Sequence, residues 1–323
     1  MKHLFIINSN AAQIRGRIPE VVQEIKAFFA NYPQFEYDIH VTRWKRDATG
    51  YSRRYVTGAR EIVRVYAVGG TSTLFEVVNG VIGVPNVQVG VYPFGKDNAF
   101  LQYFGKGKLH LFQSLRNLVF SGVTSMDAML CGNNYGMSSC YIGVDAMAAQ
   151  TSETFVEQAG AFFKREPILS LIYVFAGFMC AMKKDNTQYY RVSIDGATLD
   201  GEYLTILTAN QPYYGPTLYP AIDARPNDGM LDIYLLKPVS KMPMLKMGMD
   251  YVHGRYHKWP RLISHYRGKS VSISSDQFMS ICLDGEMFFN TSIDHTVIPH
   301  AIDFVCPGGV DPLHPEAAWR GAS

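Results

Sequence analysis

The 323-residue sequence is poor in cysteine, and its cysteines follow no regular spacing. The five thiols lie at Cys131, Cys140, Cys180, Cys282 and Cys306, an odd number without any C-x-x-C pair. Such a pattern predicts neither a disulfide framework nor a zinc knuckle. The cysteine content therefore favours a reducing compartment, and we expect a cytoplasmic protein.

The sequence also lacks a surplus of charge of either sign. Lysine and arginine total 30, against 28 aspartate and glutamate residues, which leaves a formal net charge of +2. So small a balance provides no electrostatic basis for binding nucleic acid. Binding partners must therefore be inferred from local sites, and the composition leaves a homodimer open.

No apolar run is long enough to cross a bilayer. The longest, Ile168 to Met182, has 15 residues, whereas a membrane-spanning helix needs about 20. We expect a buried or partly lipid-facing helix here, hence no transmembrane span, with a peripheral location at the membrane left open. Leu4–Ile7 is too short for the apolar core of a signal peptide and is typical of a buried strand.

The length favours two domains, because single hydrophobic cores stop growing near about 250–300 residues. Residues 1–126 alternate apolar strands with helical patterns, such as strand Ile62–Val68, helix Thr73–Ile82 and strand Val87–Tyr92. This alternation predicts an α/β domain whose parallel sheet is covered by helices on both faces. Ligands of such sheets bind at the carboxyl ends of the strands.

The pattern changes in residues 127–301, where strand-like segments follow one another between turn signals. Examples are Tyr203–Ala209, Ser270–Ser274 and Met279–Leu283. They predict a mainly antiparallel, β-sandwich-like second domain with one or two helices. A closing strand near 302–306 could return to the first domain, and residues 311–323 look like a loose tail.

A glycine turn joins the third predicted strand to the helix that follows it, in the order Gly69-Gly70-Thr71-Ser72-Thr73. Glycines at such a turn let backbone N–H groups approach a phosphate, and the helix N-terminus adds a favourable dipole. The alternative is a structural turn in which Thr73 and Glu76 form a capping box. The turn alone leaves both interpretations open.

Further motifs follow in a fixed order along the chain. They are Tyr92 to Phe100 (YPFGKDNAF), Tyr141 to Ala146 (YIGVDA), Ala224 to Asp232 (ARPNDGMLD) and Leu283 to Glu286 (LDGE). With the glycine turn, they resemble the diacylglycerol-kinase-like lipid kinase family over nearly the whole chain. The resemblance implies a phosphofructokinase/NAD kinase-like N-terminal domain and a lipid substrate domain.

The resemblance also assigns residues to the nucleotide. The family's G-G-D-G-T loop falls on Gly69 to Thr73, which would cradle the phosphates of ATP. Thr42 matches a position near the nucleotide. Asn8 lies in the first loop of the family pattern, and Lys96 lies in the loop that matches the family's P-x-G-T-x-N-D.

On the acceptor side, the D-G-E element implies that Glu286 is the general base for the lipid hydroxyl, with Asp284 beside it. Asp228, with the backbone carbonyls of Arg225 and Met230, resembles the family's structural Mg²⁺ site, and oxygen ligands suit that cation. For both acidic groups the alternative is a solvated β-turn. Phosphoryl transfer needs mainly positioning, charge neutralisation and a carboxylate at the nucleophile, which agrees with these roles.

The sequence departs from the family pattern on the nucleotide side. Thr71 replaces an acidic residue that helps to organise the catalytic magnesium, and Ser72 replaces a glycine. A serine there would be strained by about 1–3 kcal/mol if the position had a positive φ. Lys96 and Ala99 stand where threonine and aspartate are usual. These changes predict weaker metal binding while phosphate binding survives.

Two main functions follow from these motifs. The first is an ATP-dependent lipid kinase that phosphorylates a hydroxyl of diacylglycerol or a related lipid at the membrane surface, with Mg²⁺. The second is a catalytically impaired relative that binds nucleotide or lipid as a sensor. An NAD kinase is a third possibility, but its family pattern does not include the late D-G-E element.

Overall fold

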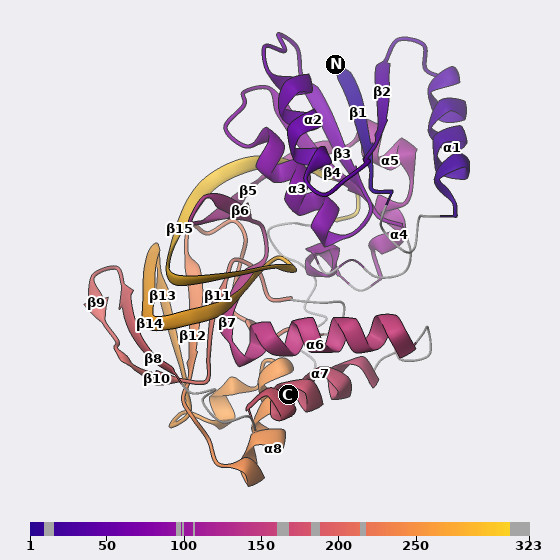
Figure 1. The fold of residues 1–323 in the computed structure, drawn as a ribbon. Coiled ribbons are helices and arrows are strands. Elements are labelled where there is room, and N and C mark those ends of the chain that lie inside the picture. Colours follow the sequence, from indigo (N-terminus) through magenta and orange to yellow (C-terminus); the bar gives the residue numbers. More distant parts are fainter. Residues whose placement is uncertain are drawn as a thin grey trace. The chain divides into compact units, whose positions relative to one another are not determined.

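The computed structural model describes residues 1–9, 16–94, 98, 100–105, 107–159, 168–181, 188–213 and 218–310 (Figure 1). The chain forms two compact units. Unit 1 contains Met1–Asp127 and the segment from Pro299 onward, and unit 2 contains Ala128–Ile298. The predicted tail at 311–323 lies outside the described residues.

Unit 1 alternates strands and helices along the chain. Its elements are β1 (Lys2–Ile7), α1 (Ile18–Ala30), β2 (Glu36–Val41), α2 (Asp47–Val56), β3 (Val63–Val68), α3 (Thr71–Val81), β4 (Val87–Tyr92), the 3₁₀ helix η1 (Phe100–Phe104), α4 (Leu109–Phe112) and α5 (Leu115–Phe120). The strands are hydrogen-bonded in the order β2-β1-β3-β4, and all are parallel. The prediction of a parallel α/β sheet is confirmed.

Helices cover both faces of this sheet, with α2 and α3 on one side and α1 and α5 on the other (Figure 1). All six residues of β3 are buried, as expected for a central parallel strand covered on both faces. Phe29 of α1 packs edge-on against Phe5 of β1. On the same face, the buried Arg64 of β3 donates to the carbonyl oxygen of Leu118 in α5 at 2.8 Å, which ties that helix to the sheet.

Unit 2 is built mainly from antiparallel strands. Its elements are β5 (Gly122–Cys131, which begins in unit 1), β6 (Asn134–Gly136), β7 (Ser139–Gly143), α6 (Val144–Ala159), α7 (Ile168–Ala181), β8 (Gln188–Ile194), β9 (Ala197–Thr198), β10 (Gly201–Tyr203), β11 (Thr205–Ala209), β12 (Leu231–Leu236), α8 (Lys241–Val252), the 3₁₀ helix η3 (Tyr256–Lys258), β13 (Ile263–Gly268), β14 (Ser270–Leu283) and β15 (Glu286–Cys306, which ends in unit 1). Strands β13-β12-β11-β7-β14-β15 follow one another across the sheet. The predicted antiparallel domain is confirmed.

Strand β14 takes part in two different strand pairings on its β7 and β8 side. Its first half pairs with β8, between Val271 and Ser274, and its last residues pair with β7. An irregularity between Ser274 and Met279 separates the two halves. Bulges that let one strand join two sheets are typical of β-sandwiches. In unit 1, the far end of β15 pairs in parallel with β4.

Several predicted boundaries in unit 2 are wrong. The expected strands Ser270–Ser274 and Met279–Leu283 are one strand, β14, because a bulge interrupts the pairing without ending the strand. The expected strand Tyr203–Ala209 is two strands, because β10 pairs with β8 whereas β11 pairs with β7 and β12. Strand β13 carries no alternation strong enough to be predicted.

The apolar segment near residue 170 forms α7, which packs against α6 and α8 (Figure 1). Its buried side chains include Tyr173 and Val174. Leu171, Phe175 and Met179 are 61%, 56% and 49% exposed, and their spacing of four residues places them on one helical stripe. Among the described residues, no helix is long and apolar enough to span a membrane.

Candidate functional site

The residues predicted to bind nucleotide lie at the carboxyl ends of adjacent parallel strands in unit 1. Ile7 pairs with both Val41 and Val68, and Val68 pairs with Tyr92, so the four strands end level with one another. The residues that immediately follow the first three of these strands are Asn8, Thr42 and Gly69. The sheet register therefore brings together side chains that are far apart in the sequence.

Hydrogen bonds fix the loops at this edge. Asn8 Nδ2 donates to Thr73 Oγ1 at 3.1 Å, and the Ser9 amide donates to Thr42 Oγ1 at 3.1 Å. Asn98, which is 2% exposed, donates from Nδ2 to the Gly69 carbonyl at 3.4 Å. Asn98 was not among the predicted site residues, although it falls on the asparagine of the family's P-x-G-T-x-N-D pattern.

The two glycines of the turn differ in their surroundings. A Cβ on Gly69 would lie 2.5 Å from Thr73 Oγ1, and its φ of +154° is one that L-residues rarely adopt. Gly70 has a φ of −97°, and a Cβ there would meet nothing within 4 Å. Gly69 is thus required by the turn itself, whereas the absence of a side chain at Gly70 leaves open space beside the backbone.

Helix α3 begins directly after this turn. Its first intrahelical hydrogen bond runs from the Leu74 amide to the Gly70 carbonyl, and no side chain in the described part of the chain caps its N-terminus. The amides of the first turn therefore have no acceptor within the helix, and together with the helix dipole they favour an anion. Thr71 and Ser72 form this turn, and neither has a positive φ, so the serine is not strained.

The capping-box alternative for this turn is wrong. Thr73 Oγ1 accepts a hydrogen bond from Asn8, and the Glu76 side chain accepts hydrogen bonds from α2 instead of from α3. The Glu76 carboxylate accepts from the amides of Arg46 at 3.0 Å and Ala48 at 3.2 Å, at the start of α2. Neither Thr73 nor Glu76 therefore caps the N-terminus of α3 at Thr71. The predicted ligand Lys96, and Ala99, lie outside the described residues.

The D-G-E element forms a tight hairpin between β14 and β15 in unit 2. Leu283 pairs with Glu286, which leaves Asp284 and Gly285 as a two-residue loop with φ of +48° and +91°. Two positive φ values are the signature of a type I′ turn, for which Asp-Gly is a favoured pair. The turn alternative is therefore correct for the backbone, but Asp284 is not solvated, being only 6% exposed.

The Asp284 carboxylate is held by three backbone amides. Met137 donates to Oδ2 at 2.6 Å, Ser139 donates to Oδ1 at 2.9 Å, and Ser138 lies within hydrogen-bonding distance of both oxygens. Burial raises the pKa of this carboxyl to about 6, although the three amides act in the opposite direction. Asp284 thus fastens the hairpin to the start of β7, while the half-buried Glu286 begins β15.

The predicted magnesium ligand Asp228 lies in a turn and already has protein partners. Its Oδ1 accepts from the Met230 amide at 3.1 Å, and its Oδ2 forms a salt bridge with Arg267. Asp228, Arg225 and Arg267 are among the residues that line an open pocket of about 370 Å³. A dication at Asp228 would have to compete with the Arg267 guanidinium, so magnesium binding there stays a prediction.

Comparison with known proteins places these features in one family. A model described as "Diacylglycerol kinase catalytic domain" matches residues 2–131. A second, "YegS C-terminal NAD kinase beta sandwich-like domain", matches residues 138–306, which is more than half of the chain. Fold and motifs thus define a two-unit member of a kinase family. The chain belongs to the diacylglycerol-kinase-like lipid kinase family, as the motif resemblance predicts.

Individual relatives agree with this assignment. Proteins named "Putative lipid kinase" from Staphylococcus aureus strains JH9 and USA300 are each 27% identical over 249 residues, covering 76% of this chain and 78% of the relative. A solved structure titled as a putative diacylglycerol kinase from Bacillus anthracis strain Sterne has a TM-score of 0.70 at 19% identity, covering 96% of this chain and 98% of that one. Another from the same strain, titled as a diacylglycerol kinase, has a TM-score of 0.65 at 17% identity, with the same coverage. At these identities the structures establish the fold.

Proposed function

We propose that this protein transfers the γ-phosphoryl group of ATP to a hydroxyl of diacylglycerol or a related lipid. The observation that carries the proposal is the start of α3 behind the Gly69-Gly70 turn, which no side chain caps among the residues that the structure describes. Membership of the family indicates phosphoryl transfer as the class of reaction, and the surroundings of individual residues support the role proposed for each.

The turn in unit 1 fits the phosphates of a nucleotide. Open space at Gly70 lets a phosphate oxygen approach the backbone, and the first amides of α3 are available to donate to it. Asn98 and Asn8 hold Gly69 and Thr73 in place on either side. The phosphate site is therefore preorganised by neutral groups, so anion binding there does not depend on a metal.

Magnesium fits this edge less well. The side chains of Asn8, Thr42, Thr71, Thr73 and Asn98 offer amides and hydroxyls rather than carboxylates, the ligand that Mg²⁺ usually takes from a protein. The carboxylate of Asp47, after β2, already accepts from the Arg43 amide and contacts His40. In kinases the ion neutralises the phosphates during transfer. The steps assigned below to this chain's own residues require no protein-bound metal.

On the acceptor side, we assign the base to Glu286. Its carboxylate takes the proton of the lipid hydroxyl as the oxygen attacks the γ-phosphorus, and the bond to the β–γ bridging oxygen breaks, releasing ADP. Asp284 acts as a positioning residue, because its carboxylate is fully used by the amides of residues 137–139. A hairpin pinned in this way keeps Glu286 in a fixed place within unit 2.

The lipid would be reached at a membrane surface, and α7 is the segment we expect to make that contact. Its stripe of Leu171, Phe175 and Met179 exposes about half of each apolar side chain to solvent. Single exposed apolar residues are common, but an aligned stripe on one helix is a feature of interaction surfaces. Helix α8, which packs on α7, adds the exposed Met242.

The decisive experiment measures transfer of labelled phosphate from ATP to vesicles that contain diacylglycerol and a panel of other hydroxyl lipids. Glu286→Gln should lower turnover by about 10²–10⁴-fold, the usual contribution of a general base. Glu202→Gln is the matched control, because Glu202 is an exposed glutamate on β10 in the same unit. Equal turnover in wild type and Glu286→Gln would contradict the assignment of the base.

A separate experiment tests whether α7 contacts the membrane. Replacing Leu171 and Phe175 by serine should reduce sedimentation with anionic vesicles, while phosphorylation of a short-chain, water-soluble diacylglycerol stays unchanged. Trp44→Ser is the control, because Trp44 is 62% exposed but lies in unit 1. An equal loss of vesicle binding in both variants would show that α7 has no special role.

A second function, binding of nucleotide or lipid without turnover, is favoured by the departures from the family pattern at Thr71, Ser72 and Ala99. Calorimetry of ATP binding with and without magnesium distinguishes the two. Binding of similar strength in both conditions, with no phosphate transfer to any lipid, would favour the sensor. Strong dependence on magnesium would show that the edge does hold the ion.

A further inference from the structure

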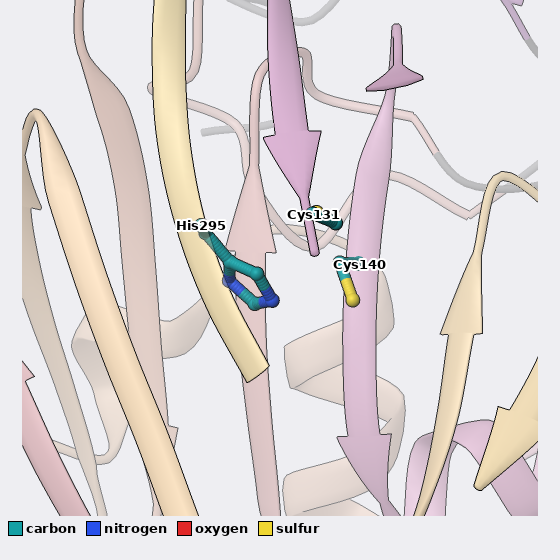
Figure 2. A group of neighbouring side chains, drawn as sticks. All are labelled: Cys131, Cys140 and His295. Carbon is teal, nitrogen blue, oxygen red and sulfur yellow. The ribbon is translucent and has the colours of Figure 1, made fainter. Parts of the chain in front are cut away.

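Three potential metal ligands that have no role in the proposed reaction converge inside unit 2, next to the strands that hold Asp284. Cys131 lies at the end of β5, Cys140 in β7 and His295 in β15 (Figure 2). Their ligand atoms all lie within 4.8 Å of one another. The three residues are 1%, 0% and 1% exposed, so the cluster is closed to solvent.

The orientation of His295 is fixed by a second residue. Its Nδ1 lies 2.9 Å from Oγ1 of Thr208, a side chain that is itself fully buried. With Nδ1–H donating to this hydroxyl, the lone pair is on Nε2, which interacts with the Cys140 thiol but makes no standard hydrogen bond among the described residues. A buried polar atom without a partner costs about 1–3 kcal/mol, so its retention calls for an explanation. Metal-binding histidines are commonly oriented by such a hydrogen bond on the other ring nitrogen.

The surroundings of the two thiols affect their pKa values differently. Burial opposes ionisation of Cys140, whereas its hydrogen bond with Cys131 and the neighbouring His295 act to lower its pKa. Burial raises the pKa of Cys131, and the interaction with Cys140 adds to the rise. A cation between the two sulfur atoms would favour the thiolate form of both.

We propose that Cys131, Cys140 and His295 form a structural zinc site. Two Zn–S bonds and one Zn–N bond form, two S–H bonds break, and two protons leave for the solvent. The product carries no net charge, because two thiolates balance Zn²⁺ and the imidazole is neutral, so the ion can be buried. Sulfur and imidazole ligands select zinc over magnesium or calcium, and one buried water would complete the tetrahedron.

Zinc at this site would stabilise the β14–β15 hairpin that carries Glu286. Cys140 pairs with Leu283 across β7 and β14, and the neighbouring Ser139 amide holds the Asp284 carboxylate. An ion that joins β7 to β5 and β15 would therefore stiffen the strand on which this hairpin is anchored. This inference stands on the cluster itself and does not require that the protein be a kinase.

The test uses the reduced, full-length protein and zinc alone, without nucleotide or lipid. Metal content is measured after purification, and the metal-free protein is titrated with Zn²⁺ against a chromophoric chelator. We expect one equivalent of zinc, release of two protons on binding, and a higher Tm in the zinc form. Titration with Co²⁺ should produce thiolate-to-cobalt charge-transfer absorption.

Variants locate the ion. Cys140→Ala and His295→Gln should abolish equimolar binding, and Thr208→Val, which leaves all three ligands in place, should weaken it by about 10–100-fold. Cys282→Ala is the matched control, because Cys282 is 1% exposed in the adjacent strand β14 but outside the cluster. It should keep full binding.

Two results would overturn the proposal. The first is wild-type protein, with its thiols shown to be reduced, that binds no zinc and shows no cobalt charge-transfer band. The second is a disulfide between Cys131 and Cys140 that forms in air while zinc does not compete with it, which would make the pair a redox couple instead. Both readouts use the wild type, so they hold even if a variant does not fold.

Discussion

Alanine at Gly69 should destabilise unit 1, whereas alanine at Gly70 should leave its stability nearly unchanged. The added methyl group at Gly69 would overlap Thr73 Oγ1 at 2.5 Å and crowd Thr73 Cβ at 3.3 Å. At Gly70 it would meet no atom within 4 Å, on an extended backbone. The two substitutions are chemically identical and adjacent, so each controls for the other.

The magnitude for Gly69→Ala follows from two contributions. Overpacking costs about 1–3 kcal/mol, and a φ that favours glycine adds about 1–3 kcal/mol. Moving Thr73 aside would also disturb its hydrogen bond with Asn8. Against this, alanine restricts the unfolded chain by about 0.4–1 kcal/mol. A net loss of about 3 kcal/mol corresponds to a fall in Tm of roughly 10 °C for a unit of this size.

Gly70→Ala should weaken ATP binding and leave the stability of unit 1 nearly unchanged. If phosphate approaches the backbone at Gly70, the methyl group occupies part of that space, and ATP affinity should fall about tenfold or more, equivalent to about 1.4 kcal/mol. Scanning calorimetry measures the Tm, and isothermal calorimetry measures the affinity. Equal destabilisation by the two substitutions would refute the described turn geometry. Unchanged ATP binding in Gly70→Ala would refute the phosphate site.

Two further predictions concern the stability of unit 1. Glu76→Ala removes the acceptor for the amides of Arg46 and Ala48, so it should cost about 1–2 kcal/mol and speed hydrogen exchange at the start of α2; unchanged exchange there would contradict this role. Burial lowers the pKa of His3 from 6.5 to about 3, so the folded state favours the neutral ring. Its contribution to stability is therefore complete above pH 6.5 and is lost as the pH falls towards 3. His3→Phe should flatten denaturation profiles over this range, and parallel profiles for the two proteins would disprove the role of His3.

Local sequence patterns determined much of the architecture. Apolar runs of strand length alternating with amphipathic helices predicted the parallel unit, because each element must bury one face or both. Asp-Gly pairs predicted tight turns, since few other residues tolerate two successive positive φ values. Predicted strand boundaries were wrong where the pairing of neighbouring strands sets them. The bulge of β14 and the break between β10 and β11 both depend on such pairing.

The candidate sites depended more on tertiary structure. The sequence indicated a glycine turn at Gly69, because its strand and helix are adjacent in the chain. It could not reveal that Glu76 caps a different helix, or that Asp284 is buried under the amides of residues 137–139. These are contacts between distant segments, and no spacing rule encodes them.

The cluster of three potential metal ligands shows most clearly what only the tertiary structure decides. Cys131, Cys140 and His295 follow no ligand spacing in the sequence, and the cysteine pattern predicted only the absence of a knuckle. Three strands bring them within 4.8 Å because each contributes one inward-facing side chain to the interior of unit 2. Local chemistry thus determined which elements form, and the pairing of strands far apart in the chain decided which side chains meet.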